Sequence, residues 1–226
     1  MKIAGELTIK DWKDLEEKLA PNNDELWSLA FHFFEERIRT RYLNPINAIL
    51  DLKLNNGEGF AVVNLQCSLI ETIECFIKGW ISEFDVGKRK TIWKNKGVIA
   101  KYPNVNNGKN IGNTEIFISF FDKRKPFIDL IIDGTDFFRN VRCGLLHETQ
   151  TKNNWKIKKG TVGGKSYEFD GVIKIIYRDN FQKDIVALLE NYKKAIISGE
   201  VFDSQIKTCE LRDNFKAKMK HICDKS

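Results

Sequence analysis

Apolar residues recur at intervals of three and four along most of the chain, the spacing that places them on one face of an α-helix. The longest such run extends from Phe60 to Glu83 without a proline and is nearly apolar enough to be buried on two sides. The same spacing recurs in residues 9–20, 25–42, 114–121, 127–132, 137–147, 180–197 and 203–223. The pattern therefore predicts a mostly α-helical protein.

Two segments depart from the helical spacing. Residues 85–113 are rich in glycine, asparagine and lysine, which predicts an irregular basic insertion. Residues 152–177 alternate apolar and polar side chains around glycines, which predicts short strands and a small β-hairpin. The run Ile116-Phe117-Ile118 fits a strand as well as a helix. We expect one helical domain over residues 1–226 that carries these two insertions.

Short polar residues mark the expected starts of three helices. Thr8 precedes the first helical segment, and either Asn23 or Asp24 precedes the second. Asp136 precedes the helix predicted from Phe137 to about His147. Their side-chain oxygens can accept hydrogen bonds from the unpaired N–H groups of a first helical turn, so we predict that each is an N-cap.

The composition is that of a soluble globular protein, with 42% hydrophobic and 30% charged residues. No segment approaches the roughly 18 apolar residues that span a bilayer, and the first ten residues lack the apolar core of a signal peptide. The five cysteines are scattered and form no C-x-x-C pair. We expect a cytosolic protein with reduced thiols, no metal site, no cofactor and no membrane partner.

The net charge is +6, and the basic residues gather in residues 87–96, 123–125, 152–159 and 216–220. Such clusters either contact phosphates or form solvated faces, and the sequence leaves both interpretations open. If the partner is a nucleic acid, Lys88, Arg89, Lys90 and Lys152 are the candidate substrate-binding residues.

The segment from Gly160 to Ser166 has the appearance of a phosphate-binding loop, but two features argue against that function. The position that must be glycine is Lys159, and the segment is followed by a strand pattern rather than by a helix. We therefore predict that it is a glycine-rich turn between two strands.

The run from Phe137 to Glu148 has the most distinctive chemistry, because it combines two arginines and an asparagine with one of only three histidines. The other two, His32 and His221, lie among packing residues and in the basic tail. Four residues share one face of an ideal helix: Arg139, Asn140, Cys143 and His147. Arg142 lies about 140° from His147 at about 100° per residue, so it flanks this face.

A histidine beside arginines suits the cleavage of RNA. The imidazole can remove the proton of the ribose 2′-hydroxyl, and a guanidinium can stabilise the charge on a pentacoordinate phosphorus. In the alternative interpretation, His147 caps the C-terminus of its helix and the arginines pair with Glu71, Glu74 or Glu148. Gly144, in the same run, lets another backbone approach closely.

Arg142 and His147, separated by four residues at the end of a helix, resemble the HEPN superfamily, whose signature is an arginine and a histidine separated by four to six residues. The resemblance covers roughly residues 25–197 and implies a helical bundle. Family members usually have a polar residue, most often asparagine, directly after the motif arginine, where this chain has Cys143. Either the pair Arg139-Asn140, one turn earlier, substitutes for it, or the site is non-catalytic.

The resemblance implies a metal-independent endoribonuclease of a toxin–antitoxin or phage-defence system, acting as a homodimer on RNA, with a cognate protein antitoxin as a possible partner. His147 is then the general base and Arg142 the phosphate clamp. The residues expected to assist them are Arg139, Asn140, Cys143, Glu71 and Glu74. Two alternatives remain, a non-catalytic helical module for binding or dimerisation and a structural domain whose arginines form internal salt bridges.

Overall fold

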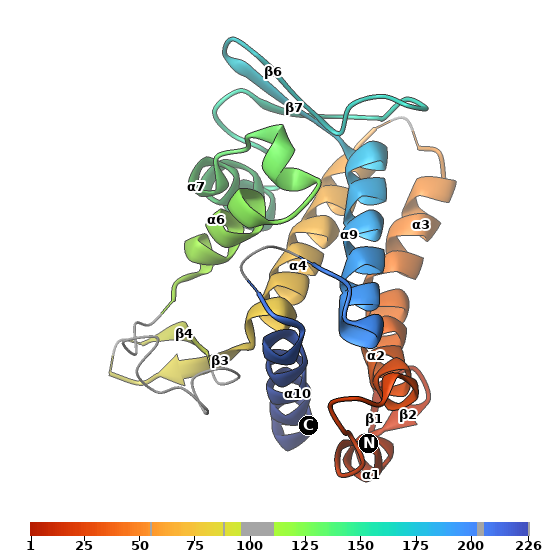
Figure 1. Ribbon diagram of the computed structural model, residues 1–226. Coiled ribbons are helices and arrows are strands. Elements are labelled where there is room, and N and C mark those ends of the chain that lie inside the picture. Colours follow the sequence, from red (N-terminus) through yellow and green to blue (C-terminus); the bar gives the residue numbers. More distant parts are fainter. Residues whose placement is uncertain (55, 88, 96–110, 203–205, 226) are drawn as a thin grey trace. The chain divides into compact units, whose positions relative to one another are not determined.

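The computed structural model describes residues 1–54, 56–87, 89–95, 111–202 and 206–225, and it is mostly helical as predicted (Figure 1). These residues group into two compact units. The first comprises Met1–Leu43, Ile73–Gly112 and Glu190–Ser226, and the second comprises Asn44–Thr72 and Asn113–Leu189. The boundaries fall within helices α4 (Glu58–Lys78) and α9 (Arg178–Ser198), so each of these helices contributes to both units. A single HEPN-like domain over residues 1–226 stays a prediction.

The first unit contains most of the N-terminal and C-terminal helices. Besides the ends of α4 and α9, it consists of β1 (Lys2–Ala4), β2 (Leu7–Thr8), α1 (Ile9–Glu16), α2 (Asp24–Ile38), the π-helix η1 (Arg39–Leu43), β3 (Trp80–Asp85), β4 (Lys90–Asn95) and α10 (Thr208–Lys225). Aromatic rings form its core. Phe34 lies 4.5 Å from Phe76 and Phe76 lies 5.5 Å from Phe215, measured between ring centroids. Burial of such large apolar surfaces is the main stabilising contribution.

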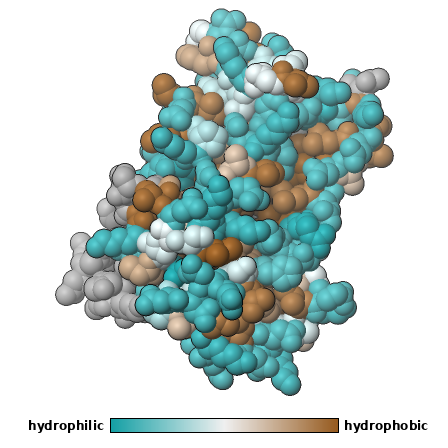
Figure 2. All heavy atoms as spheres, turned by 45° about the vertical axis from the view of Figure 1, so that its right-hand side comes forward, coloured by the Kyte–Doolittle hydropathy of each residue, from teal (hydrophilic) through white to brown (hydrophobic). Residues whose placement is uncertain are grey.

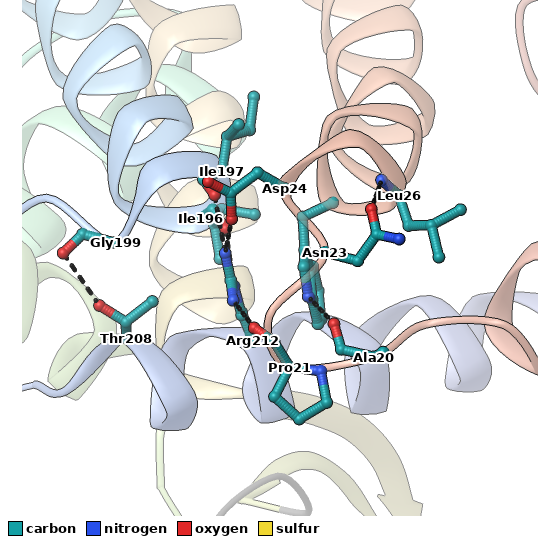
Figure 3. A network of polar contacts seen from close by, with 11 residues as sticks. Ala20, Pro21, Asn23, Asp24, Leu26, Ile196, Ile197, Gly199, Thr208 and Arg212 are labelled. Carbon is teal, nitrogen blue, oxygen red and sulfur yellow. Dashed lines mark hydrogen bonds and ion pairs between the residues drawn. The ribbon is translucent and has the colours of Figure 1, made fainter.

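A buried arginine joins three segments of the first unit (Figure 3). Arg212 of α10 donates hydrogen bonds to the carbonyls of Ile196 and Ile197 at 2.8 and 2.7 Å, and also to the carbonyl of Pro21. Its guanidinium lies 4.8 Å from the ring centroid of Trp27. The last carbonyls of a helix have no partner inside that helix, so Arg212 caps the C-terminus of α9.

The second unit contains the segment with the arginines and His147. Besides the starts of α4 and α9, it consists of α3 (Asn44–Asp51), α6 (Asn113–Lys123), the 3₁₀ helix η2 (Phe127–Leu130), α7 (Gly134–Phe137), the π-helix η3 (Phe138–Arg142), α8 (Cys143–Glu148), β5 (Trp155–Lys158), β6 (Tyr167–Asp170) and β7 (Ile173–Tyr177). Phe137 is central to its aromatic core, with ring centroids 4.7 Å from Phe121 and 5.5 Å from Trp155.

The strands predicted after the motif helix are confirmed, although they form more than a hairpin. β6 and β7 pair antiparallel, and β5 adds to the other edge of β7 in parallel. Parallel pairing needs a connection longer than a hairpin turn, and here residues 159–172 supply it. The glycine-rich segment, predicted as a turn, lies within this connection between β5 and β6.

The predicted end of the long helix is wrong. α4 ends at Lys78, and β3 then occupies the predicted last turn of the helix and pairs antiparallel with β4, which lies inside the segment predicted to be irregular. Gly79 has a φ of 63°, a left-handed conformation that ends the helix at low cost for glycine alone. A β-carbon there would also lie 2.7 Å from Oδ1 of Asn214. The rest of the predicted insertion, residues 96–110, lies outside the described residues.

Two of the three predicted helix caps are confirmed. The side chain of Thr8 accepts a hydrogen bond from the N–H of Asp11, and that of Asn23 accepts one from Leu26. The third prediction is wrong, because Asp133 rather than Asp136 caps α7 and accepts hydrogen bonds from the N–H groups of Thr135 and Asp136. The Asp136 carboxylate instead accepts hydrogen bonds from the side chains of Asn140, Trp155 and Lys174.

Helix α4 corrects the prediction that no segment approaches the length of a membrane span. By length and composition alone, Glu58–Lys78 is apolar enough to cross a bilayer. Its residues Val62, Ile70 and Phe76 are nevertheless fully buried within the protein, as in the core helix of a soluble protein. The face drawn in Figure 2 is largely hydrophilic, with hydrophobic side chains in separate patches.

Candidate active site

The segment with the arginines and His147 is not one regular α-helix. It consists of α7, a π-helical turn over Phe138–Arg142, and α8. A π-helical turn is wider than an α-helical turn, so the angles expected from ideal helix geometry do not hold across it. Arg139 and Asn140 lie within this turn, so the face that they were predicted to share with His147 does not describe the site, whereas Arg142 ends the turn and α8 follows it.

Arg142 is held by the long helix α4. Its Nε donates a hydrogen bond of 2.7 Å to Oε1 of Glu71, and the Arg142 side chain is 20% exposed. The guanidinium carbon lies 5.7 Å from the ring centroid of Phe138. Burial lowers the pKa of Arg142, but the hydrogen bond and the charge of Glu71 outweigh burial, so the pKa is raised. Arg142 therefore stays positively charged.

The contact with Glu71 engages only one side of the guanidinium. Within the described part of the chain, Nε is the only nitrogen of Arg142 that donates a hydrogen bond. The two Nη groups are thus available to a ligand, and a guanidinium can bind two oxygens of a phosphate side by side. The second acidic candidate, Glu74, is fully buried on α4 and belongs to the first unit.

Asn140 belongs to a different network. Its Nδ2 donates a hydrogen bond of 2.7 Å to Asp136, and its Oδ1 accepts one of 3.0 Å from Nδ2 of Asn153. The other carboxylate oxygen of Asp136 accepts hydrogen bonds from Nε1 of Trp155 and Nζ of Lys174 at 2.8 and 2.7 Å. Asn140 is only 8% exposed. Through Asp136, its amide links the helical segment to Trp155 and Lys174 of the three-stranded sheet.

Asp136 is the centre of this network. Burial raises the pKa of its carboxyl, but the hydrogen bonds from Lys174, Trp155 and Asn140 outweigh burial and lower the pKa below its ordinary value. Asp136 was predicted to be a helix cap because it precedes the predicted helix. Its actual partners Trp155 and Lys174 are 19 and 38 residues away in the sequence. No local signal in the sequence identifies such a contact.

Arg139 and His147 are both exposed to solvent. Within the described residues, neither side chain makes a hydrogen bond or an ion pair. His147 lies in the last turn of α8, which ends at Thr149 with a left-handed φ of 58°. Both side chains can therefore reach a ligand without breaking an existing contact.

The chain turns back over α8 at Gly144, as predicted for a close backbone approach. A β-carbon at Gly144 would lie 2.5 Å from the carbonyl oxygen of Gln150. The N–H of Lys152 donates a hydrogen bond of 2.9 Å to the carbonyl of Asn140. Cys143, the departure from the family motif, is half-buried and carries a free thiol.

The predicted substrate-binding lysines and arginine are divided between the two units, and one lies outside the described residues. Lys152 belongs to the second unit, is partly buried and pairs with Glu148. Arg89 is exposed in the first unit, Lys90 begins β4, and Lys88 lies outside the described residues.

A cavity formed by described residues of the second unit does not include Arg142 or His147. It has a volume of about 740 Å³ and lies between η2, the glycine-rich segment and the first turns of α9. A smaller cavity of about 280 Å³ lies at the start of α4. No group of three or more His, Cys, Asp or Glu side chains in the described ranges is arranged to hold a metal ion.

Comparisons with protein-family models, with curated proteins and with solved structures found no match.

Proposed function

We propose that this protein is a metal-independent endoribonuclease of the HEPN type, with His147 as general base and Arg142 as phosphate clamp. One observation supports this most strongly: Glu71 binds Nε of Arg142, as a purely structural ion pair would, but neither Nη group has a hydrogen-bond partner among the described residues. A carboxylate that fixes an arginine from one side orients its other side for a phosphate. Arg139 is an exposed second cation in the same segment.

The proposed reaction is transfer of the phosphodiester to the neighbouring 2′-oxygen. His147 removes the 2′-hydroxyl proton, and the resulting oxygen forms a new bond to phosphorus. The bond to the 5′-oxygen breaks, and that oxygen takes a proton from solvent. The products are a 2′,3′-cyclic phosphate and a 5′-hydroxyl. The Nη groups of Arg142 would stabilise the added negative charge of the pentacoordinate phosphorus.

We further propose that the protein is a cytosolic homodimer of a toxin or phage-defence system. Arg142 and His147 are five residues apart, which corresponds to about 7.5 Å along an ideal helix. Two copies of the segment facing each other would surround a phosphodiester from both sides. Leu146, beside His147, is 48% exposed and supplies apolar surface for such a contact. A cognate protein antitoxin would cover the same residues.

A substrate with one altered sugar tests this mechanism. The preferred cleavage position is first mapped in a pool of RNA sequences with EDTA present. The mapped sequence is then made with a single 2′-deoxynucleotide immediately before the scissile phosphate. We expect the wild-type protein to cleave the all-RNA strand and to leave the modified strand intact at that position. Cleavage of both strands at equal rates would rule out attack by the 2′-oxygen.

The alternative function is a non-catalytic helical module for binding or dimerisation. The observation that favours it is the engagement of Asn140, whose amide is buried against Asp136 and Asn153. The polar residue proposed to replace the missing family asparagine therefore has a structural role. Under this alternative the protein binds RNA or a protein partner through Arg139 and His147 without cleaving any substrate.

A further inference from the structure

A cationic cavity lies at the start of α4, in the same unit as Arg142. It has a volume of about 280 Å³. The segment before α4, the end of β5 and the start of α9 line it. Its charged lining residues are four basic side chains and one acidic side chain, namely Lys53, Lys158, Lys159, Arg178 and Glu58.

Arg178 is the buried member of this set. Its side chain is 9% exposed, and it donates hydrogen bonds from Nη2 to Glu58 at 2.7 Å and from Nε to Asp179 at 3.2 Å. The third nitrogen, Nη1, has no hydrogen-bond partner among the described residues. Gly59 leaves room for that group, because a β-carbon there would lie 3.0 Å from Nη1. The buried guanidinium thus retains donors for a ligand.

The three lysines give the cavity more positive charge than its two neighbouring carboxylates balance. Lys53, Lys158 and Lys159 are exposed, and none of them forms an ion pair with a described residue. Glu58 and Asp179 are already occupied by Arg178. The Arg178 hydrogen bond lowers the pKa of Glu58 against the effect of burial, and the charge of Lys159 lowers it further. The cavity therefore has an excess of positive charge, which favours an anion.

We propose that this cavity binds a phosphate group of the RNA backbone, at a distance from the phosphate that is cleaved. This inference rests on the proposed function. Gly59 and Glu71 lie on the same helix, twelve residues and therefore about 18 Å apart along its axis. The cavity would anchor the strand several nucleotides away from Arg142. Contacts of this kind fix the register of a nucleic acid without reading its sequence.

The test measures binding of a fluorescein-labelled single-stranded RNA by fluorescence anisotropy. The His147→Ala protein is used so that the RNA stays intact. Into it we introduce Lys158→Ala with Lys159→Ala, and as a matched control Lys123→Ala with Lys125→Ala, two exposed lysines of the same unit that line neither cavity. Both pairs remove two positive charges. All four lysines are exposed, so circular dichroism should show unchanged folding.

We expect the double substitution at Lys158 and Lys159 to weaken RNA binding about tenfold. The negative slope of log K against log salt should become shallower by about 0.7, which corresponds to the loss of one phosphate contact on a single strand. The control pair should change affinity less than threefold and leave the slope intact. Equal losses in both variants would show general electrostatic attraction and overturn the proposal, as would unchanged binding in both.

A second arm distinguishes an RNA phosphate from a small phosphate ligand. The melting temperature is measured with inorganic phosphate and with chloride at equal ionic strength. If the Lys158/Lys159 pair abolishes stabilisation by phosphate but leaves RNA binding unchanged, the site serves a small ligand and the proposal fails. Cleavage is scored separately in the wild-type protein. If the wild type cleaves RNA and the Lys158/Lys159 variant binds RNA as tightly as its parent, this inference alone is contradicted. If the Lys158/Lys159 variant loses RNA binding selectively but the wild type does not cleave RNA, the proposed activity alone is contradicted.

Discussion

At the scale of single residues, the contact between Arg142 and Glu71 determines what the site can bind. A guanidinium has a forked shape, so one carboxylate can hold Nε while the two Nη groups remain available. An ammonium cannot divide its donors in this directed way. The identity of the cation, and not only its charge, therefore matters for the proposed activity.

The first prediction concerns the substitution Arg142→Lys. It keeps the positive charge and the pairing with Glu71 but removes the bidentate clamp. We expect the rate of RNA cleavage to fall about 100-fold, because one oriented source of charge stabilisation is lost from the transition state. The unfolding free energy should change by less than about 1 kcal/mol, since the partly exposed ion pair persists. Retention of more than half the wild-type cleavage rate would argue against the clamp.

A second prediction concerns Asp136, whose carboxylate accepts three hydrogen bonds. Asp136→Asn places an NH₂ group where an acceptor is needed, and we expect the unfolding free energy to fall by about 2 kcal/mol. The folded-state pKa of Asp136 is lowered, so its stabilisation is present above the unfolded pKa of about 3.9 and is lost as the pH falls through the folded-state value.

The pH dependence provides the check on this second prediction. Urea unfolding at a series of pH values should show a wild-type advantage above about pH 5 that narrows below about pH 4. The exposed residue Asp122 supplies the control, since Asp122→Asn should change the unfolding free energy by less than about 0.5 kcal/mol. An advantage of the wild type that stayed constant down to pH 2 would be inconsistent with this account of Asp136.

At the scale of elements, local patterns predicted most helices, and the exceptions have identifiable causes. The helical spacing correctly located α2 and α9, because their apolar faces are determined by nearby residues. The end of α4 was predicted wrongly. The apolar residues after Lys78 keep the helical spacing, but they form β3 because they pair with β4. The parallel pairing of β5 with β7 joins residues 19 apart and has no local signal.

The sequence predicted one contact of the site correctly and misassigned one of its residues. Glu71 was a candidate partner for Arg142 because it lies on the long helix, and the structure brings the two together. Asn140 was assigned to the functional face by ideal helix geometry, which the π-helical turn invalidates. Its partner Asn153 lies on a separate segment that only the fold places beside it.

A third prediction concerns the capping of α9 by Arg212. The substitution Arg212→Met removes hydrogen bonds to the carbonyls of Ile196, Ile197 and Pro21 and leaves the buried acceptor of Ile196 without its partner (Figure 3). We expect a loss of about 2–4 kcal/mol in unfolding free energy. Hydrogen exchange should accelerate first in the last turn of α9. The matched substitution Lys220→Met, at an exposed cation of α10, should leave both quantities nearly unchanged.

At the scale of the whole molecule, α4 and α9 each pass through both compact units. Sequence patterns assign residues to helices, but they do not show how those helices divide between cores, which depends on contacts between distant segments. The number of copies in the functional assembly is likewise a property that one chain's pattern does not specify. It can be measured directly.

The fourth prediction is that the protein in solution is a dimer. Light scattering coupled to size-exclusion chromatography should give a mass of about twice the 26.2 kDa of the chain. Because Leu146 is exposed beside His147, Leu146→Glu should shift the protein toward the monomer by placing two like charges at the interface. A monomeric wild type would exclude the dimeric form of the proposed site.

The rate of RNA cleavage with EDTA present, compared between the wild type and His147→Ala, tests the central claim most directly. His32→Ala is the control, because His32 is a second partly exposed histidine whose side chain lies near Glu35 in the first unit. We predict that His147→Ala lowers the rate at least about 100-fold by removing the general base, and that His32→Ala leaves it unchanged. Equal rates for the wild type and His147→Ala would contradict the account.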